Sequence, residues 1–231
     1  MRQALLCLLL CGCSAQLGPV RCATDDHCAP GSYCSVGGLC ADAASCAGKP
    51  DPACAVLAPT GVSAVGGQNQ VSLAWNTIGG ATGYGVRRSI HAGGPYSDLP
   101  TLASAGLLDQ GLSAATRYYY LVHAIGPGGP GADSAEASAL TVPATPANLT
   151  ATPGAGAITL NWDPSPGVTG YRISRASADD GVYQLLINAP ATPASYLDSG
   201  LVAGKTFSYV VAALNASGAS ARSTAATATA N

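Results

Sequence analysis

The stretch Val71-Ser-Leu-Ala-Trp75 returns later in the chain as Ile158-Thr-Leu-Asn-Trp162. In both stretches the first, third and fifth side chains are large and apolar, and the two between them are small or polar. A period of two is typical of a β-strand that buries one face, because successive side chains of a strand point to opposite sides. The sequence therefore predicts two equivalent, half-buried strands.

Three further segments repeat in the same order around these two strands. Turn residues separate the segments at a spacing that is typical of short antiparallel strands in a sandwich. We therefore predict an all-β fold with two tandem seven-stranded β-sandwiches, over residues 57–142 and 144–230, joined by an extended proline-containing spacer at 141–146. The repeated pairs are Ala81-Thr-Gly-Tyr-Gly-Val86 with Val168-Thr-Gly-Tyr-Arg-Ile173, Leu108-Asp-Gln-Gly-Leu112 with Leu197-Asp-Ser-Gly-Leu201, and Tyr118-Tyr-Tyr-Leu-Val-His-Ala124 with Phe207-Ser-Tyr-Val-Val-Ala-Ala213.

The repeated aromatic residues resemble those of fibronectin type III domains. The resemblance rests on a tryptophan in the second strand, a tyrosine in the third, and a leucine followed six residues later by an aromatic residue. It implies a sandwich fold and says little about function. In this family the last of these aromatics is usually a tyrosine that hydrogen-bonds back to the chain, so we expect that bond from Tyr118 and not from Phe207. The predicted core residues are Trp75, Tyr84, Tyr118, Trp162, Tyr171 and Phe207.

The first residues are typical of an export signal. Arg2 precedes a short apolar run, and residues 1–12 are too few to span a membrane. The segment Leu10-Cys-Gly-Cys13 resembles a bacterial lipobox, which implies acylation of Cys13 and a membrane anchor. In such lipoproteins Ser14 after the cysteine implies the outer membrane or cell surface. The alternative is cleavage after Ala15, which gives a freely secreted protein.

Residues 13–55 are expected to form a cysteine-rich module. An exported segment of this length with an even number of cysteines favours three disulfides, and their connectivity stays open. The wide, nearly even gaps do not fit the paired spacing of zinc sites. The string over 22–40 resembles short cysteine-rich repeats of exported bacterial proteins and, more distantly, dickkopf-type modules. The six cysteines are Cys22, Cys28, Cys34, Cys40, Cys46 and Cys54.

We find no set of residues that predicts catalysis, a metal site or a cofactor. Charged residues make up 10% of the chain and the net charge is −2, so no basic patch indicates nucleic-acid binding. We interpret the three histidines as solvated surface residues, Asp109 and Asp198 as turn caps, and the stems of Arg88 and Arg175 as cover for the sandwich edge. The histidines are His27, His91 and His123, and the Asp25–His27 cluster is expected to face water.

The sequence leaves two functions open, and we expect neither to be enzymatic. The first is a lipid-anchored structural or adhesive module of the cell surface that interacts with other proteins. The alternative is an accessory carbohydrate-binding or spacer protein for polysaccharide degradation. The corresponding partners are an unknown surface protein or a polysaccharide, and the membrane through the anchor.

Overall fold

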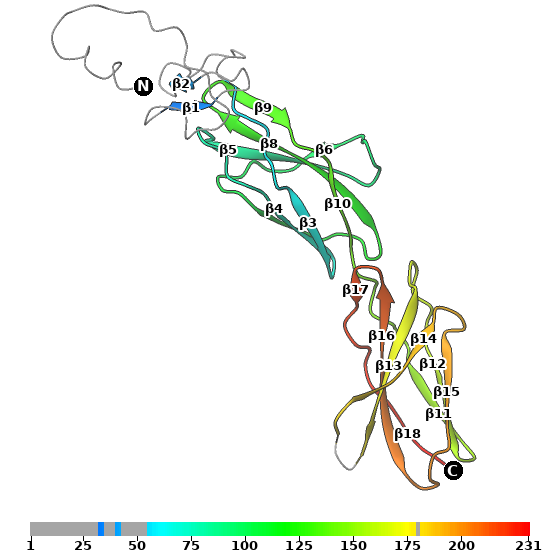
Figure 1. Cartoon of the computed structure of the whole chain (residues 1–231). Coiled ribbons are helices and arrows are strands. Elements are labelled where there is room, and N and C mark those ends of the chain that lie inside the picture. Colours follow the sequence, from blue (N-terminus) through cyan, green and yellow to red (C-terminus); the bar gives the residue numbers. More distant parts are fainter. Residues whose placement is uncertain (1–31, 35–39, 43–54, 179–180) are drawn as a thin grey trace, which may run out of the picture. The chain divides into compact units, whose positions relative to one another are not determined.

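The computed structural model describes residues 32–34, 40–42, 55–178 and 181–231, and these contain strands and no helix. The prediction of an all-β chain with tandem sandwiches is therefore confirmed (Figure 1). In the described part, no helix is long and apolar enough to cross a membrane.

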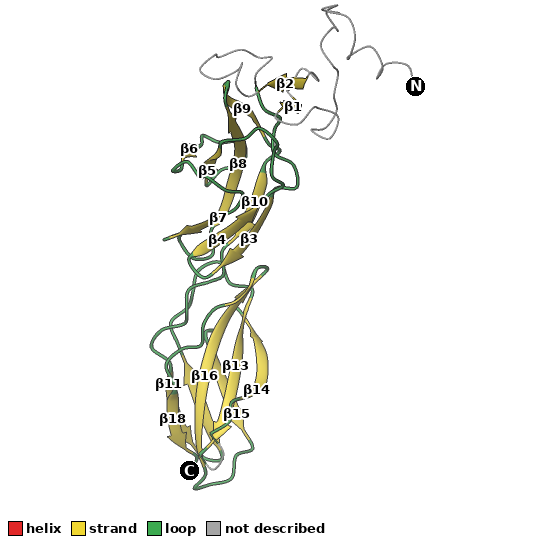
Figure 2. Ribbon diagram, turned by 90° about the vertical axis from the view of Figure 1, so that its left-hand side faces the viewer, coloured by secondary structure: helices red, strands yellow, loops and turns green. Residues whose placement is uncertain are grey.

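The first sandwich consists of two antiparallel sheets (Figure 2). One sheet has the order β3–β4–β7, and the other has the order β10–β8–β5–β6 with β9 also paired to β8. The strands are β3 (Ser63–Gly67), β4 (Gln70–Ala74), β5 (Gly83–Ser89), β6 (Ser97–Asp98), β7 (Leu107–Gln110), β8 (Arg117–Gly126), β9 (Gly129–Asp133) and β10 (Ala137–Leu140).

The second sandwich repeats this topology. One sheet has the order β11–β12–β15, and the other has the order β14–β13–β16–β17 with β18 also paired to β16. The strands are β11 (Thr150–Gly154), β12 (Ala157–Asn161), β13 (Gly170–Ser177), β14 (Gln184–Pro190), β15 (Ser195–Ser199), β16 (Thr206–Asn215), β17 (Gly218–Ala219) and β18 (Ala226–Thr229).

The last strand of each sandwich is interrupted, so that β9 with β10, and β17 with β18, each count as one strand of the predicted seven. A buried serine maintains the hydrogen bonding near each break. The Ser134 hydroxyl accepts from the Val122 N–H at 3.0 Å, and Ser223 does the same for Val211 at 3.0 Å. Because the hydroxyl replaces a missing ladder partner, the break leaves these buried amides satisfied.

The predicted alternation determines the cores. Val71, Leu73 and Trp75 are buried while Ser72 is exposed, and the second sandwich shows the same pattern around Trp162. Each tryptophan meets a tyrosine edge to face, with ring centroids 5.5 Å apart for Trp75–Tyr84 and 5.1 Å apart for Trp162–Tyr171. Edge-to-face contact is one of the two favoured arrangements of aromatic pairs.

Tyr118 and Phe207 differ where the sequence indicated a difference. The Tyr118 hydroxyl accepts a hydrogen bond from the Ser113 N–H at 3.0 Å. Tyr118 is buried, whereas Phe207 is half-buried at the border of its core and has no hydroxyl to make that bond. The placement of Phe207 inside the core is therefore corrected to its edge.

Most predictions about the N-terminal segment fall outside the described residues. These include the signal at 1–12, the acylation of Cys13, the Asp25–His27 cluster, and Cys22, Cys28, Cys46 and Cys54. The backbones of β1 (Ser32–Cys34) and β2 (Cys40–Asp42) form an antiparallel pair in which Cys34 lies opposite Cys40. The disulfides remain a prediction.

Candidate functional site

An arginine, an aspartate and a tyrosine connect the two sheets of the first sandwich. Arg88 on β5 donates through Nη1 to both carboxylate oxygens of Asp109 on β7, at 2.8 and 3.0 Å. The hydroxyl of Tyr120 on β8 donates to the same carboxylate at 2.8 Å. Because β7 belongs to one sheet and β5 and β8 to the other, the triad ties the layers together.

The same triad recurs in the second sandwich. Arg175 on β13 donates to Asp198 on β15 at 3.1 and 2.9 Å, and the Tyr209 hydroxyl on β16 donates to Asp198 at 2.7 Å. The interpretation of the two aspartates as turn caps is therefore wrong. Each aspartate is buried within a strand, and its carboxylate is held by an arginine and a tyrosine.

Strand register explains why the aspartates point inward. Asp109 pairs directly with Val71, and Asp198 pairs directly with Ile158. Directly opposed residues of an antiparallel pair lie on the same face of the sheet. Since Val71 and Ile158 are fully buried, the two carboxylates must also face the core.

The triad tyrosines remain hydrogen-bond donors. Burial, followed by the hydrogen bond to Asp109, raises the pKa of Tyr120 far above its usual value, and burial with the bond to Asp198 does the same for the pKa of Tyr209. A neutral phenol donates to a carboxylate, whereas a buried phenolate beside it is strongly disfavoured. The triads are therefore suited to holding the fold together.

An aromatic ring covers each arginine. The Arg88 guanidinium lies 5.8 Å from the ring centroid of Tyr118, and that of Arg175 lies 4.9 Å from Phe207. These distances fall within the range of cation–π contacts. About a third of each arginine side chain is exposed, 32% and 33%, and each arginine also lines a pocket.

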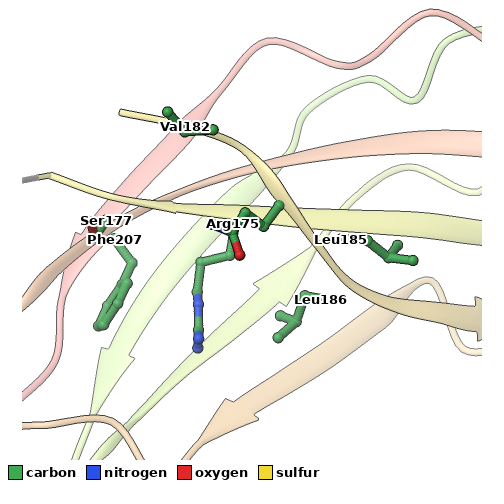
Figure 3. Close-up of a pocket in the computed structure, with 7 residues that line it drawn as sticks. Arg175, Ser177, Val182, Leu185, Leu186 and Phe207 are labelled. Atoms are coloured by element: carbon green, nitrogen blue, oxygen red, sulfur yellow. The ribbon is translucent and has the colours of Figure 1, made fainter. Parts of the chain in front are cut away.

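The two pockets occupy equivalent places in the repeats. The pocket of the second sandwich has a volume of about 200 Å³ and lies between Arg175, Phe207 and the start of β14 (Figure 3). The pocket of the first sandwich has a volume of about 450 Å³ and lies around Arg88 and Tyr118. Its other lining residues are Ser89, Ile90, His91, Pro95 and Ser97.

Glu136, the only glutamate of the chain, holds the loop beside the first pocket. Its carboxylate accepts hydrogen bonds from the Tyr96 hydroxyl and, at 2.8 Å, from the Gly93 N–H. The hydrogen bond from Tyr96 lowers the pKa of Glu136 below its usual value the most, and the bond from Gly93 lowers it further. The carboxylate is therefore used to position the loop.

His123 does not lie free in solvent, which corrects its interpretation as a solvated residue. Its side chain is 12% exposed and Nδ1 lies 3.3 Å from an oxygen of Asp133, which Arg87 also binds at 2.7 Å. The ring fits over Gly85, where a Cβ would come within 2.2 Å of Nε2. His91 is exposed and His27 lies outside the described residues. Across the described ranges, no three His, Cys, Asp or Glu side chains gather into a metal site.

Strand order and the aromatic pairs define the class of both sandwiches, which is fibronectin type III-like. Residues 144–229 match the family model of the Fibronectin type III domain. The second sandwich is therefore a fibronectin type III domain, and the first has the same topology.

Each of the following similarities extends over only part of this chain, and the first extends over only a small part of the related protein. The chain is 36% identical over 76 residues to an amylopullulanase of Thermoanaerobacterium saccharolyticum. These 76 residues make up 33% of this chain and only 6% of the amylopullulanase. A crystallised Fn3-like protein from Clostridium thermocellum is 41% identical, with 37% of this chain and 92% of that chain covered and a TM-score of 0.35. A two-domain fibronectin type III segment of chicken tenascin is 16% identical, with coverage of 74% and 98% and a TM-score of 0.47.

Proposed function

We propose that this chain is an exported, non-enzymatic module whose two sandwiches present protein-interaction surfaces. The observation that carries the proposal is the duplicated pocket, in which the arginine is already neutralised by a buried aspartate. The arginine in such a pocket therefore offers no uncompensated charge to a substrate. The pocket suits recognition of a partner surface better than it suits chemistry.

The hydrogen bonds that the carboxylates make within the protein support a non-enzymatic role. General acid–base catalysis needs a side chain that exchanges a proton with the substrate near the working pH. The triad carboxylates are instead held by arginine and tyrosine, and Glu136 is held by Tyr96 and Gly93. The strongest candidates for a base are thus engaged in positioning the fold.

The place of action in this proposal is the outer membrane or cell surface, with Cys13 as the acylated anchor. The support is the lipobox-like sequence before Cys13 and the apolar run behind Arg2. The mass of the membrane-extracted protein tests it, and we expect a mature chain that begins at an acylated Cys13. A mature chain that begins at an unmodified Gln16 would contradict the anchor.

The interaction role is tested by presenting the same immobilised chain to two kinds of partner. One arm uses insoluble polysaccharides, raw starch and cellulose, and the other uses solubilised envelope proteins of the native organism. We expect a specific retained protein and no retention on either polysaccharide. Retention on a polysaccharide, with no protein retained, would contradict the proposal.

The second candidate is an accessory role in polysaccharide degradation. It is favoured by the similarity to the amylopullulanase, whose name indicates a starch-degrading enzyme. A site for a polysaccharide usually stacks sugars on exposed aromatic rings, and every described aromatic side chain in this chain is buried or half-buried. Binding to raw starch, lost on adding soluble maltooligosaccharide, would support this candidate.

A further inference from the structure

The chain that enters the first sandwich is buried before its first strand begins. Val56 is fully buried and Pro59 is buried as well, although β3 starts only at Ser63. Residues 55–58 read Ala-Val-Leu-Ala, and we call this segment the strap. A fully buried valine outside the strands indicates that the strap lies in a fitted place, because such a side chain excludes water on every side.

Two glycines of the β8–β9 turn leave the space that Val56 occupies. A Cβ on Gly126 would come within 2.5 Å of Val56 Cγ1, and a Cβ on Gly131 would come within 2.5 Å of the Val56 carbonyl oxygen. Both distances are far shorter than the roughly 3.5–4.0 Å of a favourable contact. Neither glycine has a φ in the left-handed region, so the requirement for glycine here is one of space. We call this space the slot.

The turn itself has a composition that favours many conformations. It reads Gly126-Pro-Gly-Gly-Pro-Gly131, and glycine loses more conformational freedom on ordering than any other residue. Gly129 lies at a φ of 102°, and a Cβ built on it would meet no atom within 4 Å, so the space beside it is open. The order of this turn therefore depends on the contacts at its two ends.

One of these contacts is common to both sandwiches. The N–H and the hydroxyl of Thr82 both donate to the Ile125 carbonyl, at 2.7 and 3.0 Å. Thr169 does the same to the Leu214 carbonyl, at 2.8 and 3.3 Å. Since this contact recurs in the second copy, it does not explain why the first turn carries its glycines.

The slot belongs to the first sandwich alone. The repeat places Asn215 and Ser220 where the first copy has Gly126 and Gly131. The Ser220 hydroxyl accepts a hydrogen bond from the Ala213 N–H at 2.9 Å. The second copy therefore carries side chains at both positions, whereas the first leaves them open to Val56.

We infer that the strap locks the β8–β9 turn. The turn has one conformation while Val56 lies in the slot, and it becomes mobile when the strap leaves. Transitions between order and disorder of a short segment are a common form of conformational switch. Because the strap continues directly into the cysteine-rich segment, a partner that draws this segment away would also release the turn. This device is independent of the pockets on which the proposed function rests.

The test compares Val56→Asp with the matched control Val65→Asp in the ¹⁵N-labelled full chain. An unpaired carboxylate is too costly to bury, so Val56→Asp should expel the strap. Val65 is 66% exposed and should accept the same change. NMR relaxation gives the backbone order parameters, which are about 0.85 for a rigid residue and below about 0.6 for a flexible one. We expect Leu57 and Gly129 to be rigid in the unaltered chain and in Val65→Asp, and flexible in Val56→Asp.

A second pair of variants changes the slot instead of the strap. In Gly131→Ala the new Cβ would meet the Val56 carbonyl oxygen, a backbone atom that cannot rotate aside as a side chain can. We therefore expect Leu57 to become flexible in this variant. Gly154→Ala is the control, because its Cβ would lie 3.6 Å from the Ala157 carbonyl oxygen, an ordinary contact, and Leu57 should stay rigid.

Three results would overturn the inference. The first is a strap that is already flexible in the unaltered chain, and the second is a Gly129 that stays rigid in Val56→Asp. The third is the loss of dispersed signals from the whole first sandwich in Val56→Asp, which would make Val56 an ordinary core residue and not part of a releasable strap. The order parameters of the unaltered chain and of Gly131→Ala do not require a folded Val56 variant.

Discussion

At the scale of single residues, the two buried carboxylates stabilise the sandwiches only while their partners remain. Asp198 is 5% exposed in its side chain and receives Arg175 and Tyr209. Removing one member of a buried charge pair leaves the other desolvated and unpaired, which costs more than the pair gains. Substituting only one member of the triad is therefore expected to destabilise the sandwich strongly.

We predict that Asp198→Ala lowers the free energy of unfolding by about 2–4 kcal/mol, somewhat less than for a fully buried pair because Arg175 reaches solvent. Asp109→Ala should do the same in the first sandwich. Asp163→Ala is the control, since its carboxylate takes part in one exposed bond with Asn148 and should cost below about 0.5 kcal/mol. Urea denaturation measures all three, and equal costs for Asp198 and Asp163 would rule out a stabilising triad.

The triad tyrosines make stability depend on alkaline pH. The pKa of Tyr209 is raised in the folded chain by burial and by its bond to Asp198, whereas in the unfolded chain it returns to about 10. Above about pH 10 the unfolded state therefore releases a proton that the folded state keeps. The stabilisation is complete below that pH and is lost as the pH rises, by about 1.4 kcal/mol per pH unit for each such tyrosine.

Urea denaturation between pH 9 and 11 tests this dependence. Tyr209→Phe should reduce the loss of stability over this interval, and Tyr120→Phe should act likewise. At pH 9 each variant should be about 1 kcal/mol less stable than the unaltered chain, because the hydrogen bond to the carboxylate is gone. An unchanged pH slope in both variants would contradict the buried, neutral tyrosines.

At the scale of elements, the turn before the long strands β8 and β16 distinguishes the repeats. In the first sandwich the Tyr118 hydroxyl accepts from the Ser113 N–H at 3.0 Å and fixes that turn. Phe207 provides only a ring, which lies against Arg175. Tyr118 thus forms both a hydrogen-bonded corner and a wall of its pocket, whereas Phe207 forms only the wall.

Restoring the hydroxyl should stabilise the second turn. We predict that Phe207→Tyr raises the free energy of unfolding by about 0.5–1.5 kcal/mol, the usual net value of one hydrogen bond, and that Tyr118→Phe lowers it by a similar amount. Thermal or urea denaturation measures both changes. A neutral Phe207→Tyr would indicate that the second turn does not bring an N–H to that hydroxyl.

At the scale of the whole molecule, the repeat gives each sandwich a core of its own. The core of the second sandwich is built from its own strands around Trp162 and Tyr171, and the first has Trp75 with Tyr84 at the same place. Ion pairs between arginines and aspartates supplement this apolar packing in the described residues. Arg87, Arg88 and Arg175 are all paired with aspartates.

Removing the core tryptophan of one sandwich should destabilise that sandwich and leave the other folded. We predict that Trp162→Ala costs the second sandwich about 3–5 kcal/mol and Trp75→Ala costs the first a similar amount, since each removes a large buried ring. Two-dimensional NMR follows both sandwiches in one sample. Loss of dispersed signals from residues 144–229 in Trp162→Ala, with those of the first sandwich retained, is the expected result, and simultaneous loss of both sets would contradict separate cores.

Sequence reasoning predicted the strands, the repeat and most core aromatics, but it assigned the wrong role to Asp109 and Asp198. The signal was available, since the arginine, aspartate and tyrosine of each triad recur at matching places in both copies. What was missing was the pairing of Asp109 with Val71, which determines the face that the carboxylate occupies. The solvated interpretation of His123 was wrong for a similar reason, because Gly85 opens room for its ring from another strand.

By itself, the sequence determined that this chain forms two copies of one β-sandwich with tryptophan–tyrosine cores. Alternation and repetition are local properties, and hydrophobic burial converts them directly into strands and cores. Only the tertiary structure decided which polar side chains meet inside those sandwiches and which apolar ones stay outside. Strand register brought Asp198 to Arg175, and the bulge at Leu186 left Leu185 exposed beside a pocket. Both outcomes depend on pairing between strands that lie far apart in the chain.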